Sequence, residues 1–138
     1  SPAGAARAVG SLFLGVQLQC AECHNDPFKH WKQADYWGLA GYFRNVKWTF
    51  KGRYFDSVTE SDAPADKGAK VGKLPNDKAP PGAITIPAAA FKNAGTVIPT
   101  KVLDGDPLTV TADAPLRPLL AEWVTGPGNP YFARSFVN

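Results

Sequence analysis

Apolar residues recur at three- and four-residue steps in three parts of the chain, which is the spacing of a helix that buries one face. The first run extends from Ala5 to Gln19, the second from Ala34 to Val46 and the third from Pro115 to Val124. Asn129-Pro130 then opens a last short helix, because proline favours the first helical position. The pattern therefore predicts four helices.

The first two predicted helices carry distinct apolar faces. The face of the first helix comprises Val9, Leu12, Phe13, Val16 and Cys20. The face of the second comprises Tyr36, Trp37, Leu39, Ala40 and Phe43. Aromatic residues are dense from Phe28 to Phe50, and we expect them to form the core or to wall a cofactor pocket. Asp26 is the expected N-cap of a short helical turn over Phe28–Trp31, with Pro27 at its first position.

The middle of the chain lacks helical spacing. A small hairpin is predicted over Trp48–Phe55, followed by a long polar loop over Asp56–Pro81. Short extended segments are expected at 84–86, 96–103 and 108–111, and Asp104-Gly105-Asp106 signals a turn. The predicted fold class is mainly α, with long irregular loops and a few short β-strands.

Composition narrows the class of protein. The 138 residues suggest one domain (1–138), with a helical part at 1–50, a loop-rich part at 51–114 and C-terminal helices at 115–138. With 44% hydrophobic and 20% charged residues, the chain does not have a disordered composition. A net charge of +3 is too mild to indicate a nucleic-acid partner, and no apolar run has the length of a membrane span. The start at Ser1-Pro2, without Met, is interpreted as a processed or trimmed form.

The candidate chemistry lies in Cys20-Ala21-Glu22-Cys23-His24, a Cys-x-x-Cys-His motif. This is the attachment signature of c-type haem. Each thiol adds to one vinyl group of the porphyrin, so the two sulfurs must lie a fixed distance apart along one edge of the ring. The next histidine is then placed under the iron as the proximal ligand. The motif predicts one covalent haem c, held by Cys20 and Cys23 and ligated by His24.

Other chemistries use the same residue types. Cys20, Cys23, His24 and His30 are the ligand types of a zinc site, although adjacent Cys23 and His24 would ligate awkwardly. A redox dithiol would favour a strand-to-helix turn, whereas the preceding residues are predicted to be helical. A disulfide across two residues would be strained. Haem attachment is the favoured interpretation.

The motif does not identify the second axial ligand of the iron. The chain contains no methionine, so the His/Met pair of many electron-transfer cytochromes is excluded within it. His30 is the remaining imidazole and the candidate metal ligand besides His24. A lysine amine, the N-terminal amine, an asparagine, water or a group from another subunit are the alternatives.

The segment Phe13–His24, continued by Asp26-Pro27-Phe28 and Trp31, resembles the cytochrome c-like domains of large planctomycete proteins. The resemblance continues through residues 35–43. Residues 119–138 resemble the opening of the partner domain that follows in those proteins, which suggests a fragment or a shortened relative. The resemblance implies a small single-haem cytochrome c-like domain but gives no substrate. The family often has a second histidine at the position of Asp26, and this chain lacks that imidazole.

The leading functional prediction is a monohaem c-type electron carrier, not an enzyme, that exchanges electrons with a redox partner protein. Covalent haem attachment takes place outside the cytoplasm, so we expect an extracytoplasmic protein. No nucleophile–base constellation or phosphate loop is recognisable in the sequence. Two alternatives stay open: a structural subunit of a haem-containing homo-oligomer or filament, and a haem enzyme or gas sensor with an open distal site.

Overall fold

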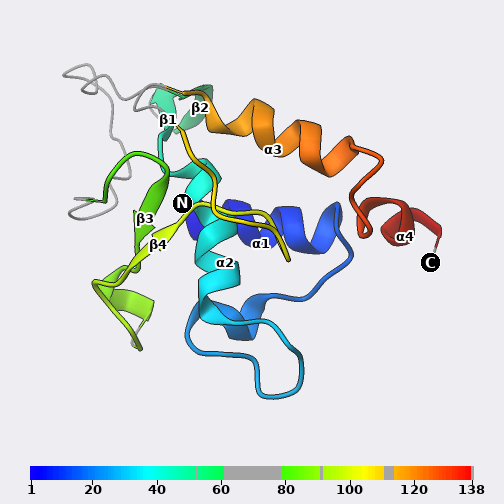
Figure 1. The fold of residues 1–138 in the computed structure, drawn as a ribbon. Coiled ribbons are helices and arrows are strands. Elements are labelled where there is room, and N and C mark those ends of the chain that lie inside the picture. Colours follow the sequence, from blue (N-terminus) through cyan, green and yellow to red (C-terminus); the bar gives the residue numbers. More distant parts are fainter. Residues whose placement is uncertain (52, 61–78, 91, 111–113, 138) are drawn as a thin grey trace.

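Helices form the centre of the computed structural model, which describes residues 1–51, 53–60, 79–90, 92–110 and 114–137. Helix α1 (Pro2–Leu12) packs against α2 (Gln33–Ala40), and α3 (Leu116–Thr125) leads to the short α4 (Phe132–Val137) at the C-terminal end (Figure 1). The 3₁₀ helices η1 (Gln19–Glu22), η2 (Gly41–Phe43) and η3 (Ala88–Ala90) connect these elements. The domain is mainly helical, as the sequence predicts.

Strands form two small antiparallel sheets in the described part of the chain. β1 (Val46–Lys51) pairs with β2 (Tyr54–Glu60), which confirms a hairpin in the predicted place but with longer arms. β3 (Ala83–Thr85) pairs with β4 (Val97–Pro99) beside α2 (Figure 1). The described part of the extended segment expected at 108–111 forms no strand; the Leu108 N–H instead donates to the Thr100 carbonyl at 2.7 Å. Thr111 and positions 61–78 of the predicted loop lie outside the described residues.

Helix α1 is shorter than the predicted helix over residues 5–19. The chain turns away after Leu12, where the Val16 N–H donates to the Gly10 carbonyl and Gly15 takes a φ of +63°. Glycine adopts this left-handed backbone without the steric cost that a Cβ would add. Leu12 and Phe13 consequently remain 68% and 45% exposed, so the predicted apolar face is wrong at its C-terminal end. The Cys-x-x-Cys-His motif begins inside η1 and ends just after it, and does not lie at the end of the first helix.

Helix α2 is buried on nearly all sides, as its apolar sequence requires. Its side chains leave at most 2% of their surface exposed at Tyr36, Trp37, Leu39 and Ala40. They pack in one core with residues from all parts of the fold, including Leu14, Leu18, Ile84, Ile86, Leu103, Leu116 and Leu120. Most of the described aromatic residues therefore belong to the core, whereas Phe28 is 92% exposed.

The loop between η1 and α2 does not form the predicted helical turn. The Asp26 carboxylate accepts hydrogen bonds from the N–H groups of Phe28 (2.8 Å) and Lys29 (3.1 Å), as an N-cap would. The Asp26 N–H, however, donates to the Trp31 carbonyl at 2.9 Å and closes a compact loop. Asp26 therefore shapes this loop, and the helix starts only at Gln33.

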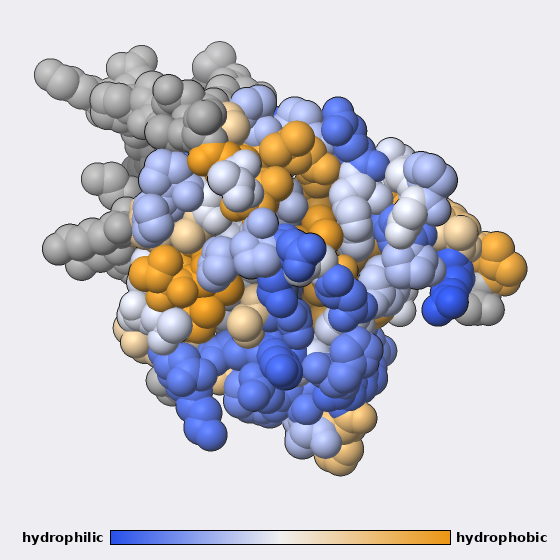
Figure 2. All heavy atoms as spheres, viewed as in Figure 1, coloured by the Kyte–Doolittle hydropathy of each residue, from blue (hydrophilic) through white to orange (hydrophobic). Residues whose placement is uncertain are grey.

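Polar and apolar surfaces lie on different parts of the molecule. Figure 2 shows mainly hydrophilic atoms over the lower part of the view, where Figure 1 places η1 and the loop that follows it. Hydrophobic atoms gather beside α3 and at the end of α4. No helix among the described residues has the length and apolar character that crossing a bilayer demands.

Candidate functional site

The two cysteines lie on one tight turn. Cys20 is inside η1 and Cys23 follows its last residue; the N–H groups of Cys23 (3.3 Å) and His24 (3.2 Å) both point to the Cys20 carbonyl. Side chains three residues apart in a 3₁₀ turn lie above one another, and Cys20 and Cys23 have this spacing, so we expect both thiols on the same side. Both are free thiols; Cys20 is exposed and Cys23 is partly exposed. A planar group could therefore reach both sulfurs from solvent along one edge.

The histidine of the motif has a defined hydrogen bond. His24 Nδ1 lies 2.7 Å from the Asn25 carbonyl oxygen, and the ring is exposed. Because a carbonyl oxygen can only accept, Nδ1 carries the proton and the lone pair of the neutral ring is on Nε2. A hydrogen bond of this kind orients a metal-binding imidazole and raises its basicity. His24 is thus prepared to ligate through Nε2.

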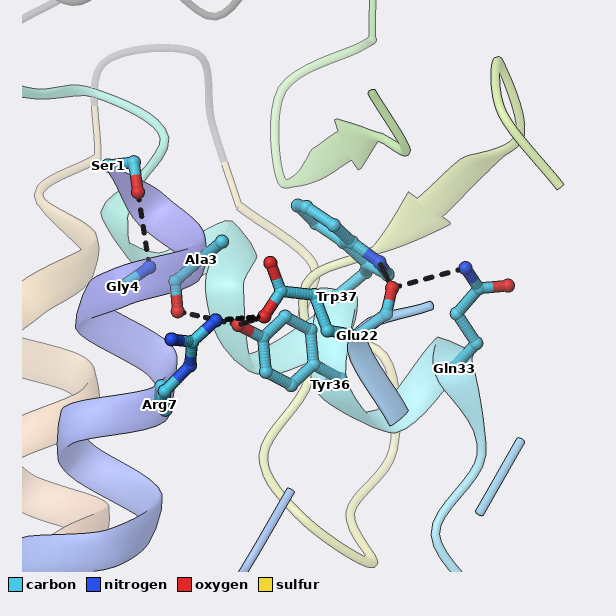
Figure 3. Close-up of polar contacts among 8 residues, drawn as sticks. All are labelled: Ser1, Ala3, Gly4, Arg7, Glu22, Gln33, Tyr36 and Trp37. Carbon is cyan, nitrogen blue, oxygen red and sulfur yellow. Dashed lines mark hydrogen bonds and ion pairs between the residues drawn. The ribbon is translucent and has the colours of Figure 1, made fainter. Parts of the chain in front are cut away.

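The side chain of Glu22, inside the motif, ties η1 to both central helices (Figure 3). Its carboxylate forms an ion pair with Arg7 of α1 and accepts a hydrogen bond from the Tyr36 hydroxyl of α2 at 3.0 Å. The same hydroxyl lies 2.7 Å from the Ala3 carbonyl. Burial, followed by the nearby Glu22 charge, raises the pKa of Tyr36, and Glu22 also raises the pKa of Arg7. The tyrosine therefore stays a neutral donor and holds the carboxylate in place.

Two side chains of α2 hold the backbone of the motif. The Trp37 indole N–H donates to the Glu22 carbonyl at 3.0 Å (Figure 3). The Gln33 side-chain amide, only 2% exposed, lies 3.3 Å from the Glu22 carbonyl and 3.2 Å from the Cys23 carbonyl. The Gln33 backbone N–H also donates to the Asn25 side-chain oxygen at 2.9 Å. Both sides of His24 are thus anchored to the start of α2.

Gln33 also reaches a segment that is distant in sequence. Its side-chain nitrogen lies 3.0 Å from the Lys92 carbonyl, and its oxygen accepts a hydrogen bond from the Asn93 side chain at 2.7 Å. Asn93 has a φ of +57°, a left-handed conformation that asparagine tolerates better than most residues. A hollow of about 410 Å³ next to the motif is lined by His24, Asn25, Lys92 and Asn93. One buried glutamine therefore positions both walls of this hollow.

His30 does not take part in this arrangement. Its ring packs against Trp31 with a centroid separation of 4.0 Å and a tilt of 41°, and its Nε2 lies 3.9 Å from a carboxylate oxygen of Asp104. The Tyr131 hydroxyl donates to the same carboxylate, so His30 faces the start of α4. The expected His30 ligand is therefore not brought beside His24, and its role as a ligand stays a prediction.

The donor set suits haem c better than the alternatives. Among the described residues, no three His, Cys, Asp and Glu side chains are grouped so as to hold a metal ion, so the zinc interpretation gains no support. Free thiols on a 3₁₀ turn between two loops differ from a strand-to-helix dithiol site and from a disulfide. Accessible thiols on one side of the turn, with a free Nε2 after them, are the groups that haem c requires.

The fold and the motif define a class: a small, mainly helical domain built around a Cys-x-x-Cys-His turn. Residues 2–48 match the model of the family PSCyt2, described as a protein of unknown function (DUF1549). The match covers about a third of the chain and includes the whole motif. It supports the predicted similarity to a planctomycete cytochrome-like family of unknown function. The further resemblance at residues 119–138 stays a prediction. Comparisons with curated proteins and with solved structures give no match.

Sequence reasoning identified the motif but missed the residues that hold it. Gln33, Asn93 and Asn25 carry no local signal, because their roles depend on contacts between segments far apart in the chain. From the sequence, Glu22 was recognisable only as a residue inside the motif. Tyr36 was recognisable only as a residue on the apolar face of a predicted helix. Their ion pair and hydrogen bonds arise from the packing of η1 against α1 and α2.

Proposed function

We propose that this domain carries one covalently attached haem c and transfers electrons outside the cytoplasm. The observation that carries the proposal is the η1 turn, where two accessible free thiols are followed by a histidine whose Nδ1 faces the Asn25 carbonyl oxygen. The bound haem would supply a one-electron iron couple, with a potential tuned by its ligands and surroundings. The protein's part is attachment, ligation and control of solvent access.

Attachment needs no oxidant or reductant beyond the two partners. Each cysteine S–H adds across a vinyl C=C bond: a C–S bond forms, and the thiol proton is transferred to the other vinyl carbon. Cys20 and Cys23 would each form one such bond from the same side of η1. His24 would ligate through Nε2, since Nδ1 is engaged by the Asn25 carbonyl. The hydrogen bonds of Trp37 and Gln33 keep the motif backbone in place for this step.

The surroundings favour electron exchange with another protein over catalysis on a bound substrate. The hollow beside His24 is polar and open to solvent, and Phe28 lies exposed on the following loop. An exposed cofactor edge shortens the path to a redox partner protein. We therefore infer an extracytoplasmic electron carrier and not an enzyme.

The test is production of the chain in a bacterial host that expresses a cytochrome c maturation system. After denaturation and acetone extraction, the polypeptide should retain haem, and its alkaline pyridine spectrum should be that of a c-type haem. Equimolar haem and protein would support the proposal. A colourless polypeptide whose two thiols both react with an alkylating reagent would overturn it.

Single variants separate attachment from ligation. Cys20→Ala and Cys23→Ala should each leave one thioether and shift the pyridine spectrum towards that of a haem with one remaining vinyl group; the double variant should lose covalent haem. His24→Ala should lower the yield of holoprotein and change the spin state of any haem retained. Ser11→Ala, on the exposed part of α1, is a control that should change none of these readouts.

A second candidate function is that of a subunit in a haem-containing assembly. Four apolar side chains stay exposed at the meeting point of α1 and α4: Leu12 (68%), Phe13 (45%), Phe136 (68%) and Val137 (84%). The Ser135 hydroxyl donates to the Phe13 carbonyl at 2.8 Å and holds the two segments together. We propose a second copy of the chain as the partner of this surface. Analytical ultracentrifugation over a hundredfold concentration range would show dimers or larger species; a monomer throughout would remove this candidate.

A further inference from the structure

We propose that Lys92 supplies the second axial ligand of the haem iron. The proposal rests on the proposed function, because it requires haem c attached to Cys20 and Cys23. Lys92 lies 68 residues after His24 in the sequence, yet both line the same hollow of about 410 Å³. It is the only amine among the described residues that line this hollow.

Several other candidate ligands are absent or engaged elsewhere. The chain has no methionine. His30 stacks on Trp31 and faces Asp104. Within the hollow, the Asn25 side-chain oxygen accepts the Gln33 N–H and the Asn93 amide donates to the Gln33 side chain. In the described part of the chain, no hydrogen bond or ion pair holds the Lys92 ammonium. Lys92 is therefore the group in this hollow that is available to a metal.

The backbone at Lys92 is held in place although its side chain is exposed. Its carbonyl lies 3.0 Å from the Gln33 amide nitrogen, which also faces the Cys23 carbonyl. Asn93 locks the same turn through its left-handed backbone, and the Thr96 N–H donates to the Asn93 carbonyl at 3.0 Å. The base of the lysine is thus fixed relative to the haem-attachment turn, whereas its four-carbon stem can adjust. This combination suits a ligand that must reach an iron from a separate segment.

Ligation by lysine has a simple chemical balance. On ligation, the Lys92 ammonium would release one proton to solvent, and the neutral Nζ would donate its lone pair to the iron. No electron is transferred in this step. Arginine at the same position would keep the positive charge, but its guanidinium does not deprotonate in proteins. Lys92→Arg therefore distinguishes ligation of the iron by the amine from an effect of the positive charge alone.

The experiment compares the spectra of holoprotein variants made with the maturation system. The ferric wild type should be low-spin, with the electron paramagnetic resonance and near-infrared signature of imidazole–amine ligation, and the ferrous form should not bind carbon monoxide. Lys92→Ala and Lys92→Arg should both convert the ferric haem to high-spin and allow stoichiometric carbon monoxide binding. Lys92→His should restore a low-spin state through a second imidazole. Lys29→Ala and His30→Ala are the matched controls and should leave the wild-type spectrum unchanged.

The outcomes separate the two proposals. Haem content after acetone extraction reports attachment alone, and all five variants should retain it, because Cys20, Cys23 and His24 are unchanged. A low-spin Lys92→Ala protein would overturn the lysine proposal and leave haem attachment intact. A high-spin wild type that binds carbon monoxide would also overturn it, in favour of an open distal site. Loss of low-spin character in His30→Ala but not in Lys92→Ala would assign the ligand to His30.

Discussion

The two sides of the central helices are held together by different forces. On the side of η1, the motif is held by directed contacts: the Glu22 ion pair and the hydrogen bonds of Tyr36, Trp37 and Gln33. On the side of α3 and α4, contacts are mainly apolar, and a groove of about 300 Å³ between these helices and α1 has an almost wholly apolar lining. Regular helices can be placed by apolar packing, which is non-directional. A short turn with exposed functional groups buries little surface and needs hydrogen bonds to fix its position.

The largest effect on stability is expected from a substitution that opens a cavity in the core, which both sides of the molecule share. Leu39 of α2 is fully buried, so Leu39→Ala should lower the free energy of unfolding by about 2–5 kcal/mol. Leu119 of α3 is 37% exposed, and the same truncation there should cost about 1 kcal/mol or less. Urea denaturation followed by tryptophan fluorescence measures both. Equal costs would mean that α2 is not the centre of the core.

The second prediction concerns a substitution, Gln33→Leu, that removes directed contacts on the motif side. Gln33→Leu retains the approximate volume of the side chain but leaves the carbonyls of Cys23 and Lys92 and the amide of Asn93 without this partner. Each buried polar group left unsatisfied costs about 1–3 kcal/mol, and partial access to water will reduce the sum. We expect a loss of about 2–3 kcal/mol, measured by urea denaturation.

A control and a local readout make the Gln33 result specific. Gln19→Leu changes an exposed glutamine of η1 and should alter stability by about 0.5 kcal/mol or less. Amide hydrogen exchange should also rise in η1 and near residue 92 for Gln33→Leu, while α3 stays protected. Uniformly faster exchange throughout the protein would show that Gln33 acts on global stability alone.

The sequence was sufficient where structure depends on neighbouring residues. The spacing of Cys20, Cys23 and His24 is set by attachment chemistry, so the motif was found without the fold. The apolar periodicity placed α3 and the start of α2 within one residue of their observed bounds. The predicted end of the second helix at Val46 is wrong, because α2 ends at Ala40 and Val46 belongs to β1. The end of the first helix was missed, although Gly15 gave a local signal, since glycine in a left-handed conformation commonly terminates helices.

The sequence was insufficient where structure depends on contacts between distant segments. Gln33 meets Lys92 and Asn93, 59 and 60 residues away, and nothing in its local sequence indicates this role. The position of His30 is likewise decided by Asp104 and Tyr131. The grouping of Lys92 and Asn93 with His24 and Asn25 around one hollow could therefore be recognised only in three dimensions.

The third prediction concerns pH. The tyrosine hydroxyl has an ordinary pKa of about 10 in an unfolded chain, and burial and Glu22 raise the pKa of Tyr36 above that value in the folded protein. The folded state therefore holds the proton more tightly, so this contribution to stability is complete below about pH 10 and is lost as the pH rises above it. Tyr131, whose pKa is raised to about 12 by burial and by the hydrogen bond to Asp104, adds a loss between about pH 10 and 12.

Removing the Tyr36 hydroxyl tests this linkage. At neutral pH, Tyr36→Phe should cost about 1–2 kcal/mol, because it removes the one hydroxyl proton that lies between the Ala3 carbonyl and the Glu22 carboxylate. Above pH 10 the variant should lose stability with pH less steeply than the wild type. Urea denaturation at pH 7 and at several values above pH 10 measures both effects. Parallel curves for the two proteins would show that Tyr36 does not control the alkaline slope; Tyr131→Phe is the matched variant on the α4 side.

The smallest expected effect has the opposite sign and concerns a buried polar side chain of the core, Thr100. Thr100 is fully buried, and its backbone N–H and carbonyl are bonded to Gly82 and Leu108 at 2.7 Å each. Its hydroxyl, however, has no hydrogen-bond partner among the described residues. The hydroxyl packs closely on η2, since a Cβ on Gly41 would lie 2.3 Å from it. Burial of an unpaired hydroxyl is unfavourable, and the shape of the side chain is what the site requires.

Thr100→Val keeps that shape and replaces the hydroxyl with a methyl group. It should stabilise the protein by about 0.5–1 kcal/mol, because the desolvation cost of the hydroxyl is removed without a lost hydrogen bond. Thr100→Ser, the matched variant, keeps the hydroxyl and loses the methyl group, and should destabilise by about 1 kcal/mol. Urea denaturation distinguishes the two signs. A destabilised Thr100→Val protein would show that the hydroxyl has a partner, and directed contacts would then fix not only η1 but also the junction of β4 with η2.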